Sequence, residues 1–425
     1  MSRRVVITGM GVVAPNAIGV PAFLHALQNG VSGLVFVPEY ERLKFNCQVT
    51  GRPDFEWEQL RAYVPEVTFH GLKGMGIGYG LKAALDAWTD AGNPIETAEP
   101  HWETGCIFGN STSDSGVMKN VFSRIEAGEA KKLGSRVVEQ MMNSGVTAYI
   151  SGRLGLAGKV ITNSAACATG SQAVLMGYEY IKHGMARRML VGSTEHVDPY
   201  TFGSFDSMRV LSRKFNHQPQ QASRPMSLTA GGFIPGSGSG ALVLEDLEFA
   251  LERGATIYAE ILGGASNSGG QRSGGSMTAS NPQGIVRCIT DSVQSAGISP
   301  EAIDLISGHL TATGGDTMEI QNWILALDRK GANFPLVNSI KSMVGHCLSA
   351  AGSIEAVAVV LQILHQFVHP NINLEDPNPE ITKRISIDQI PTTCLKREIN
   401  VVAKANFGFG DVNTCLIFSK FNKNG

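Results

Sequence analysis

Cys167 is the residue whose type and position most clearly suggest chemistry. It lies in a segment of small residues, 163–171, between an apolar run at 159–162 that predicts a buried strand and a run at 168–182 that predicts a helix ended by Gly184. A cysteine at such a corner lies at a helix N-terminus, where the helix dipole and free backbone N–H groups favour the thiolate. An inert buried cysteine is the common alternative, and the corner alone does not decide between the two.

Two histidines far downstream add to this picture. His309 opens the segment 309–313, and His346 ends the segment 338–346. One cysteine with two distant histidines fits a nucleophile that meets its partners only in the folded protein. A lone histidine is more often structural than catalytic. Two of them, each in a Gly/Ser/Thr-rich turn after an apolar run, favour an active site.

The order of these motifs resembles that of a known enzyme family. The cysteine, His-x-Thr-x-Thr, Lys-Ser-x-x-Gly-His and a final Gly-Phe-Gly at 408–410 are similar to the motifs of β-ketoacyl-acyl carrier protein synthases, and most similar to the elongating type II ketosynthases of the thiolase superfamily. The resemblance covers essentially the whole chain, from residues 4–11 to 416–418. It implies a thiolase-like α/β fold, with two similar halves stacked in five layers (αβαβα).

The resemblance implies a decarboxylative Claisen condensation and gives roles to several residues. Cys167 would carry the acyl chain, and its backbone N–H and that of Phe409 would bind the thioester oxyanion. The Phe409 ring, between two glycines, would gate the acyl pocket. Thr311 and Thr313 would bind the pantetheine amides, although alternating threonines are also typical of a strand edge.

The remaining site residues follow from the same resemblance. His309 and His346 would contact the malonyl group and donate to the developing enolate as neutral imidazoles. Lys341 would orient this network, with Glu355 as its buried carboxylate partner. An ordinary structural ion pair is the alternative for the last two.

Several positions depart from the family pattern. Leu310 and Asp411 stand where glycine is usual, and Asp316 and Glu319 fall one position early. The family's Asp-rich loop and Gly-Glu-Gly segment appear here as residues 227–233 and as 236–238, with Ser237 in the middle. These changes favour a specialised polyketide or polyene pathway over housekeeping fatty-acid synthesis. A non-elongating chain-length-factor subunit of a ketosynthase pair is the alternative, but such a subunit lacks the cysteine.

The expected partner is an acyl carrier protein, which presents substrates on its phosphopantetheine arm; no bound cofactor or metal is expected. Because carrier proteins are acidic, a basic rim should surround the entrance. The candidate contacts are Lys131, Lys132 and Arg209, followed by Lys73, Arg213 and Lys214. The resemblance also implies a dimer, with the chain itself or with a ketosynthase-like, chain-length-factor paralogue, in which the N-terminal half lends a strand to a sheet shared between subunits.

Composition limits the other classes of function. The 425 residues include 35 basic and 37 acidic ones, which gives no nucleic-acid or membrane signature. Seven cysteines without zinc spacing are typical of a reducing cytoplasm. The most apolar late stretch, 356–364, is too short to span a bilayer and predicts a buried helix.

Strand-like and helix-like segments alternate along the chain, which favours α/β layering. A helix is expected at 81–91, and a break near 253–255 is expected to divide an N-terminal half, 1–254, from a C-terminal half, 255–425, with no sequence repeat detected between them. The predicted strands are 5–8, 106–109, 159–162, 189–192, 241–244, 306–308, 336–338, 401–403 and 414–419.

A rival interpretation comes from residues 9–14, which follow the first strand. Their glycine spacing loosely matches the dinucleotide-binding fingerprint of an oxidoreductase. However, Pro15 follows at once, and the acid expected about 20 residues on is missing, since Glu39 and Glu41 come later. The match is therefore weak.

Overall fold

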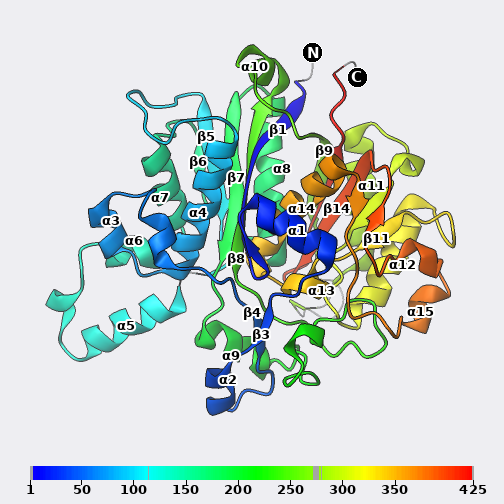
Figure 1. Cartoon of the computed structure of the whole chain (residues 1–425), viewed down its shortest axis with the longest axis horizontal. Coiled ribbons are helices and arrows are strands. Elements are labelled where there is room, and N and C mark those ends of the chain that lie inside the picture. Colours follow the sequence, from blue (N-terminus) through cyan, green and yellow to red (C-terminus); the bar gives the residue numbers. More distant parts are fainter. Residues whose placement is uncertain (1–2, 113, 271–276, 279, 424–425) are drawn as a thin grey trace.

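The protein forms alternating strands and helices around one large mixed sheet (Figure 1). The computed structural model describes residues 3–112, 114–270, 277–278 and 280–423. The strands are β1 Val5–Ala14, β2 Ala17–Ile18, β3 Leu34–Phe36, β4 Val49–Gly51, β5 Thr104–Gly109, β6 Val160–Ile161, β7 Arg188–Glu195, β8 Gly238–Asp246, β9 Ala259–Ser268, β10 Leu305–Ser307, β11 Leu336–Asn338, β12 Phe367–Val368, β13 Leu395–Lys396, β14 Val401–Gly408 and β15 Val412–Ser419.

The helices lie between these strands. They are α1 Val20–Asn29, α2 Pro38–Arg42, α3 Glu66–Gly71, α4 Met75–Asp90, α5 Ser115–Glu126, α6 Val137–Met141, α7 Gly145–Leu154, α8 Thr169–Lys182, α9 Pro199–Ser207, α10 Leu247–Glu252, α11 Pro282–Ala296, α12 Gly315–Leu327, α13 Lys341–Val344, α14 Ala351–His365 and α15 Pro379–Thr382. Short 3-10 turns, η3 Ala166–Ala168 and η6 Leu348–Ala350, precede α8 and α14.

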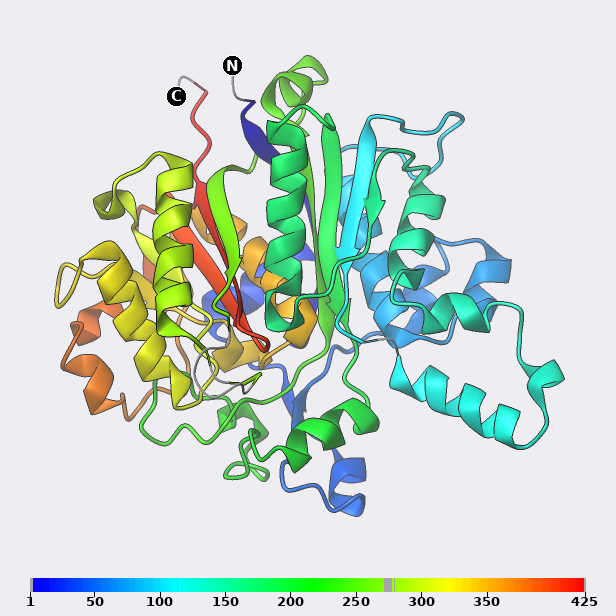
Figure 2. The same cartoon turned by 180° about the vertical axis from the view of Figure 1, so that it is seen from behind.

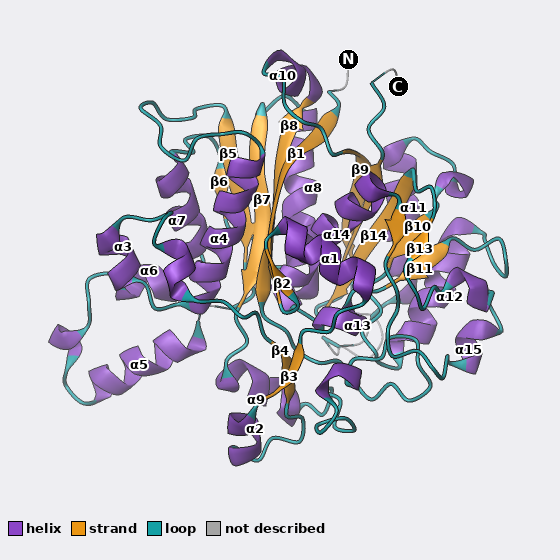
Figure 3. Cartoon of the chain, in the orientation of Figure 1, coloured by secondary structure: helices purple, strands orange, loops and turns teal. Residues whose placement is uncertain are grey.

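The sheet consists of two similar sets of strands. The order β11-β10-β14-β15-β9 in one half mirrors β6-β5-β7-β8-β1 in the other, and β1 joins β9 in the middle (Figure 3). In each set the three outer strands are parallel and the pair β7–β8 or β14–β15 is antiparallel. The repeat therefore exists in the topology although none is detectable in the sequence. We propose that the halves meet at the turn between α10 and β9.

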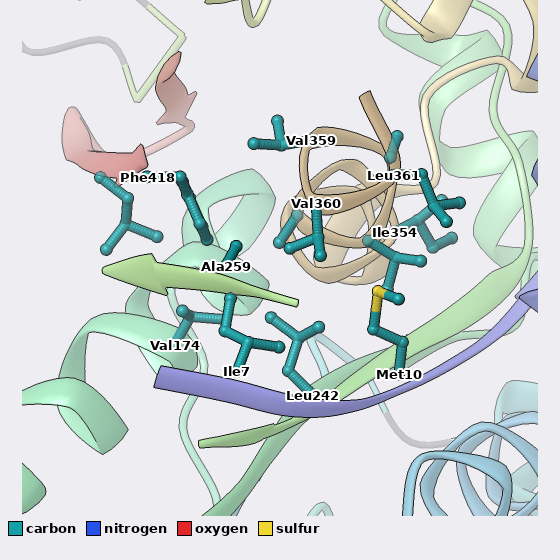
Figure 4. Packing of buried hydrophobic residues seen from close by; sticks show 14 of the residues in the cluster. Ile7, Met10, Val174, Leu242, Ala259, Ile354, Val359, Val360, Leu361 and Phe418 are labelled. Atoms are coloured by element: carbon teal, nitrogen blue, oxygen red, sulfur yellow. The ribbon is translucent and has the colours of Figure 1, made fainter. Parts of the chain in front are cut away.

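The helices make three layers with the two sets of strands between them. α4 packs on β1 and β8, α11 packs on β9 and β15, and α8 and α14 lie between the two sets, as Figures 1 and 2 show. In Figure 4, side chains from both sets of strands meet α8 and α14 in one apolar cluster, including those of Ile7, Val174, Ile354 and Phe418. Burial of this cluster is the main stabilising contribution. The predicted five-layer αβαβα fold is confirmed.

α14 is the most apolar helix. Together with η6 it gives an 18-residue helical stretch, Leu348–His365, that is long and apolar enough to cross a membrane, but 89% of it is buried inside the protein. The apolar stretch predicted at 356–364 is therefore only part of a longer helix. The prediction of a buried helix is confirmed, because the two sets of strands enclose α14 on both sides.

Close packing explains where the predicted strand ends were wrong. β1 continues through Gly9 and Gly11 to Ala14. Glycine is required at both positions because α4 packs directly on the strand. A Cβ at Gly9 would lie 2.2 Å from the Ala87 carbonyl oxygen, and one at Gly11 would lie 1.9 Å from that of Ala83. These glycines let a helix approach the strand. They do not form the strand-to-helix turn that a dinucleotide phosphate needs.

Two further expectations for strands need correction. β6 is an edge strand that pairs only with β5 among the described strands, and 42% of the Val160 side chain is exposed, so it is not buried. β9 was not among the predicted strands. It is a central strand on which α11 packs closely. This packing requires a glycine at Gly263, since a Cβ there would lie 2.6 Å from the backbone nitrogen of Ala296 in α11.

Candidate functional site

Cys167 lies at the predicted corner between a strand and a helix. It occupies the middle of η3, directly before α8, and Ala166 takes a left-handed backbone conformation with φ of 47°. The Thr169 hydroxyl closes the turn, since it accepts from the Ala165 N–H at 2.8 Å and donates to the Ala166 carbonyl at 2.7 Å. The thiol is thereby held at the start of the helix, with only 9% of the residue exposed.

The hairpin between β14 and β15 brings Phe409 to this thiol. A Cβ at Gly408 would lie 3.1 Å from the Cys167 nitrogen and 3.0 Å from the Ala165 carbonyl oxygen, so a glycine at this position favours the close approach of the two backbones. Burial raises the pKa of Cys167 to about 11, although the backbone N–H groups of Phe409 and Cys167 and the charge of Lys341 oppose it. The expectation of a favoured thiolate is therefore wrong for the free protein, because desolvation outweighs the helix N-terminus.

His346 has one ring nitrogen committed and one free. The Leu348 backbone N–H donates to Nδ1 at 3.2 Å, so the proton of the neutral ring is on Nε2. Nε2 is buried and has no hydrogen-bond partner among the described residues. Burial, and then the charge of Lys341, lowers the pKa of His346 to about 3. The ring is thus a neutral donor for which the described part of the chain offers no acceptor.

His309 lies against His346, with ring centroids 5.2 Å apart and planes at 84°. Sγ of Cys167 and a ring nitrogen of each histidine all lie within 4.8 Å of one another. Nδ1 of His309 faces Nδ2 of Asn406 at 3.3 Å. Burial, with the charges of Lys341, His346 and Lys404, holds the pKa of His309 well below its usual value, so this ring is neutral too.

Behind the histidines lies a buried network of charges. Oε1 of Glu355 accepts a hydrogen bond from Lys341, and Oε2 accepts one from Nδ2 of Asn406 at 2.8 Å and forms an ion pair with Nζ of Lys404 at 3.1 Å. Burial alone would raise the pKa of Glu355, but the two lysine charges outweigh it and lower that pKa. The sequence predicted the Lys341–Glu355 pair but missed Lys404 and Asn406. Their alternation along β14, which puts both on one face, was the available signal.

Two buried acids hold the segment that carries His309. Glu319 accepts the N–H groups of His309 and Leu310, both at 2.7 Å, and Asp316 accepts that of Thr311 at 2.9 Å. Burial raises the pKa of Glu319 to about 7 and that of Asp316 to about 6. Sequence reasoning noted the shifted spacing of these acids but not this role. The Leu310 side chain, at a position where glycine was expected, packs into the apolar core of the C-terminal half.

A cavity of about 470 Å³ opens beside Cys167. Its lining includes both histidines, Thr311, Thr313 and Phe409. A second hollow of about 230 Å³ is lined by Thr311, Thr313 and Phe409 as well. The two threonine hydroxyls are 3.1 Å apart. The half-buried Phe409 ring borders both hollows, and its centroid lies 6.5 Å from that of Phe205.

Two other departures from the family pattern have clear contacts. Asp411 has φ of 62°, and its Oδ1 accepts the Asn281 N–H at 3.1 Å while its carbonyl accepts that of Gly269 at 2.9 Å. It therefore joins the Phe409 hairpin to the segment after β9. Ser237 accepts the Val197 N–H at 2.9 Å through its hydroxyl, so it is a structural contact.

The basic candidates lie on separate surface segments. Lys131 and Lys132 are exposed on the 3-10 turn Ala130–Lys132, where Lys132 pairs with Glu129. Arg209 is exposed after α9, next to Val210, which lines the Cys167 cavity. A separate hollow of about 730 Å³ lies on the α5 side of the molecule, and its basic lining residues are His70, Lys73, Arg124, Lys132, Arg136 and His196.

Besides Cys167 and the histidines, one further group in the described residues has metal-like spacing: Asp114, His196 and Asp198, with ligand atoms within 4.8 Å. Both oxygens of Asp114 already accept hydrogen bonds, from backbone N–H groups and from His196 Nδ1 at 3.0 Å. One oxygen of Asp198 caps α9. These contacts account for most of the group without an ion.

Comparisons with known proteins agree with this geometry. Residues 2–250 match the beta-ketoacyl synthase N-terminal domain and residues 258–375 the C-terminal domain. A putative mitochondrial 3-oxoacyl-[acyl-carrier-protein] synthase of Schizosaccharomyces pombe is 34% identical, over 99% of both chains, and a putative polyketide beta-ketoacyl synthase of Streptomyces cyaneus is 31% identical, over 99% of this chain and 98% of the relative.

Solved structures give the same result. A beta-ketoacyl synthase from Burkholderia phymatum superposes with a TM-score of 0.90 at 28% identity, over 99% of this chain and all of that one. A type II polyketide ketosynthase, solved with its acyl-carrier protein and bound to a hexaketide, gives 0.85 at 30% identity, with the same coverage. The chain therefore belongs to the β-ketoacyl synthase family, which makes it an acyl-transferring enzyme that forms carbon–carbon bonds.

Proposed function

We propose that the protein condenses an acyl chain on Cys167 with malonyl-acyl carrier protein, with loss of carbon dioxide. One observation carries the proposal: a ring nitrogen of each of two neutral histidines lies within 4.8 Å of a thiol that faces two backbone N–H groups, and Nε2 of His346 has no hydrogen-bond partner among the residues that the structure describes. A thiol alone would serve many acyl transfers. Two neutral donors beside it suit a step in which an enolate oxygen develops.

The reaction has two stages, acyl transfer to Cys167 and then condensation with the malonyl group. The Cys167 sulfur attacks the acyl thioester, the carrier thiol leaves with the cysteine proton, and the N–H groups of Cys167 and Phe409 stabilise the oxyanion. Malonyl-thioester then loses carbon dioxide, and the electron pair forms an enolate whose oxygen accepts from His309 and His346. The enolate carbon attacks the acyl-Cys167 carbonyl, which releases the cysteine sulfur and leaves a 3-oxoacyl thioester on the carrier; the sulfur regains one proton from water.

The pathway and partners form part of the same proposal. The departures from the family pattern at Leu310, Ser237 and Asp411 are the basis for proposing a specialised polyketide or polyene pathway over housekeeping fatty-acid synthesis. Carrier docking would use Lys131, Lys132 and Arg209, and Thr311 and Thr313 would bind the pantetheine arm. Exposed edge strand β6 supports a dimer, with a second copy or a paralogue, because an open edge favours pairing. All seven cysteines lie in described residues and are unpaired, which supports a reducing compartment such as the cytoplasm.

Reconstitution tests this function. The purified chain, alone and co-expressed with a neighbouring ketosynthase-like gene, receives acyl- and malonyl-carrier protein from the same gene neighbourhood. Intact mass should rise by one acyl group, and the carrier should then hold a 3-oxoacyl chain longer by two carbons. Equal acylation of Cys167→Ala protein would contradict the assignment of the nucleophile. Absence of any acyl transfer in both preparations would favour a non-elongating partner subunit.

A further inference from the structure

A second lysine, Lys404 on β14, lies in the centre of the molecule, and the proposed chemistry does not yet use it. Its side chain is completely buried. Nζ contacts three groups, Oε2 of Glu355, the Ser171 hydroxyl and Oδ1 of Asn406. A buried lysine is expensive unless every donor is satisfied, and an ammonium group has three donors. The three contacts account for all of them.

The charge of this lysine is maintained at neutral pH. Burial lowers the pKa of Lys404 to about 8, with the Glu355 carboxylate opposing the shift. The group is therefore mostly an ammonium at pH 7. Lys341 and Lys404 together carry one positive charge more than Glu355 can neutralise, and this excess lies beside His309, whose protonation it opposes.

The hydrogen bonds of Lys404 fix the orientation of the Asn406 amide. An ammonium group can only donate, so the Asn406 atom that it contacts must be the oxygen, which also accepts from the Ser171 hydroxyl. The amide nitrogen then points to Oε2 of Glu355 at 2.8 Å and to Nδ1 of His309 at 3.3 Å. The carboxylate can only accept, so both sides of the amide require the same orientation.

This orientation determines where His309 carries its proton. Because the Asn406 amide nitrogen donates to Nδ1, the neutral imidazole must be protonated on Nε2. Nδ1–H would instead meet an N–H group. His346 reaches the same tautomer by a different route, through the Leu348 backbone N–H. A backbone donor cannot turn around, whereas a side-chain amide can, so the orientation of this amide depends on the groups that hold it, Lys404 and Ser171 at its oxygen and Glu355 at its nitrogen.

We propose that Lys404 is a positioning residue, which acts through Asn406 to hold His309 as the Nε2–H tautomer that donates to the malonyl enolate. This rests on the proposed condensation for its effect on rate, but the tautomer itself is independent of it. Lys404 is not among the residues that line the cavity, so we expect it to act on the step in which His309 acts. Acylation of Cys167 should not need it.

The test compares Lys404→Met in the full chain with Lys82→Met as a matched control. Lys82 also pairs with a carboxylate, Asp86, at 2.6 Å, but on α4, away from the cavity. We expect Lys404→Met to lower kcat for malonyl-carrier decarboxylation by up to about 100-fold, the loss that a misplacement of roughly 1 Å can cause, with KM and Cys167 acylation within about threefold. Lys82→Met should leave all three unchanged. Wild-type decarboxylation by Lys404→Met would overturn the proposal, as would equal losses in acylation and decarboxylation.

Two further measurements separate positioning from general structure. Asn406→Ala keeps the Lys404–Glu355 pair and removes the donor to His309, so it should give the same kinetic signature even where Lys404→Met folds poorly. The double variant should lose no more than the larger single loss, because both changes act on one step. Additive losses would mean that Lys404 acts elsewhere.

The tautomer can be observed directly. Long-range ¹H–¹⁵N spectra of protein labelled with ¹⁵N-histidine, with His309 assigned by His309→Gln, should show protonated Nε2 in wild type and mixed tautomers in Lys404→Met. An unchanged Nε2–H signal in that variant would contradict the inference. If wild type itself does not decarboxylate malonyl-carrier protein, the proposed function fails, while this spectrum still decides the role of Lys404.

Discussion

The two halves of the molecule contain the same corner, and in one of them it carries a thiol that borders a cavity. Ala166 and Leu348 both have φ of 47°, each begins a 3-10 turn, and each turn leads into a central helix, α8 or α14. The second position of the turn is Cys167 in one half and Ser349 in the other. The backbone is repeated, but the side chain and its surroundings are not.

What each corner faces explains the difference. Cys167 faces a cavity and the Phe409 N–H. Ser349 instead donates to the buried Glu195 carboxylate at 2.6 Å, so its hydroxyl is used structurally. The helices also cross reciprocally: a Cβ at Gly170 would lie 2.4 Å from the Ser353 nitrogen, and one at Gly352 would lie 2.3 Å from that of Ser171. A helix N-terminus by itself therefore does not make a nucleophile; the groups opposite it do.

The largest effect is expected when the thiol of Cys167 is removed. Cys167→Ala should lower acyl transfer at least about 1,000-fold, as loss of a nucleophile does in other enzymes, while Ser349→Ala keeps the transfer within about threefold of wild type. Intact mass after incubation with acyl-carrier protein measures both. Comparable acylation of the two variants would show that the corners do not differ as described.

Next come the histidines, which lie in the C-terminal half and face the N-terminal corner. His346→Ala and His309→Ala should each lower malonyl decarboxylation about 100- to 1,000-fold, as loss of one oxyanion donor does, and still accept an acyl group on Cys167. Carbon dioxide release and intact mass separate the two steps. A histidine whose alanine variant condenses at nearly the wild-type rate is structural.

The buried thiol predicts a pH dependence. Burial raises the pKa of Cys167 to about 11, and only the thiolate reacts, so alkylation by iodoacetamide should rise about tenfold per pH unit from pH 7 to 9, without a plateau. The exposed Cys394 serves as an internal reference for reagent reactivity. Peptide mass spectrometry resolves the two sites. A plateau for Cys167 near pH 7 would mean that the helix N-terminus outweighs burial after all.

The Ser349 hydroxyl in the turn before α14 should contribute to the free energy of unfolding. Ser349→Ala removes the hydroxyl hydrogen bond to Oε2 of Glu195, although this oxygen keeps the Ser111 hydroxyl and the Ser349 backbone N–H as donors. Loss of one buried hydrogen bond typically costs about 1 kcal/mol. Urea unfolding of Ser349→Ala and Cys167→Ala measures this, since the latter removes no strong hydrogen bond. Equal midpoints for the two variants would contradict the division of roles.

The smallest effect concerns the proposed gate. Phe409→Ala should change the relative acylation rates for chains of different length several-fold, because its ring borders both hollows. Its stability loss should fall below the roughly 3–5 kcal/mol of a fully buried phenylalanine, because the ring is only half-buried. A full-sized loss of stability with unchanged chain-length preference would assign Phe409 to packing.

The sequence predicted the site better than its surroundings. Cys167, both histidines and the Lys341–Glu355 pair come together as expected, because their motifs are short and each is placed by its own turn. The sequence analysis placed no strand at β9 and ended the first strand at residue 8, which left the glycines of β1 and β9 outside the predicted strands. In both strands glycine serves close helix packing, which depends on a partner distant in the chain.

The sequence by itself determined the reactive residue types, their order and the alternation of strands and helices, since these depend on neighbours along the chain. Only the tertiary structure decided the protonation states. Burial keeps Cys167 a thiol and both histidines neutral. Lys404 reaches Ser171, 233 positions away, only after the two halves stack. Desolvation and charge act through space, so the chemistry of the site is set by groups that no local pattern brings together.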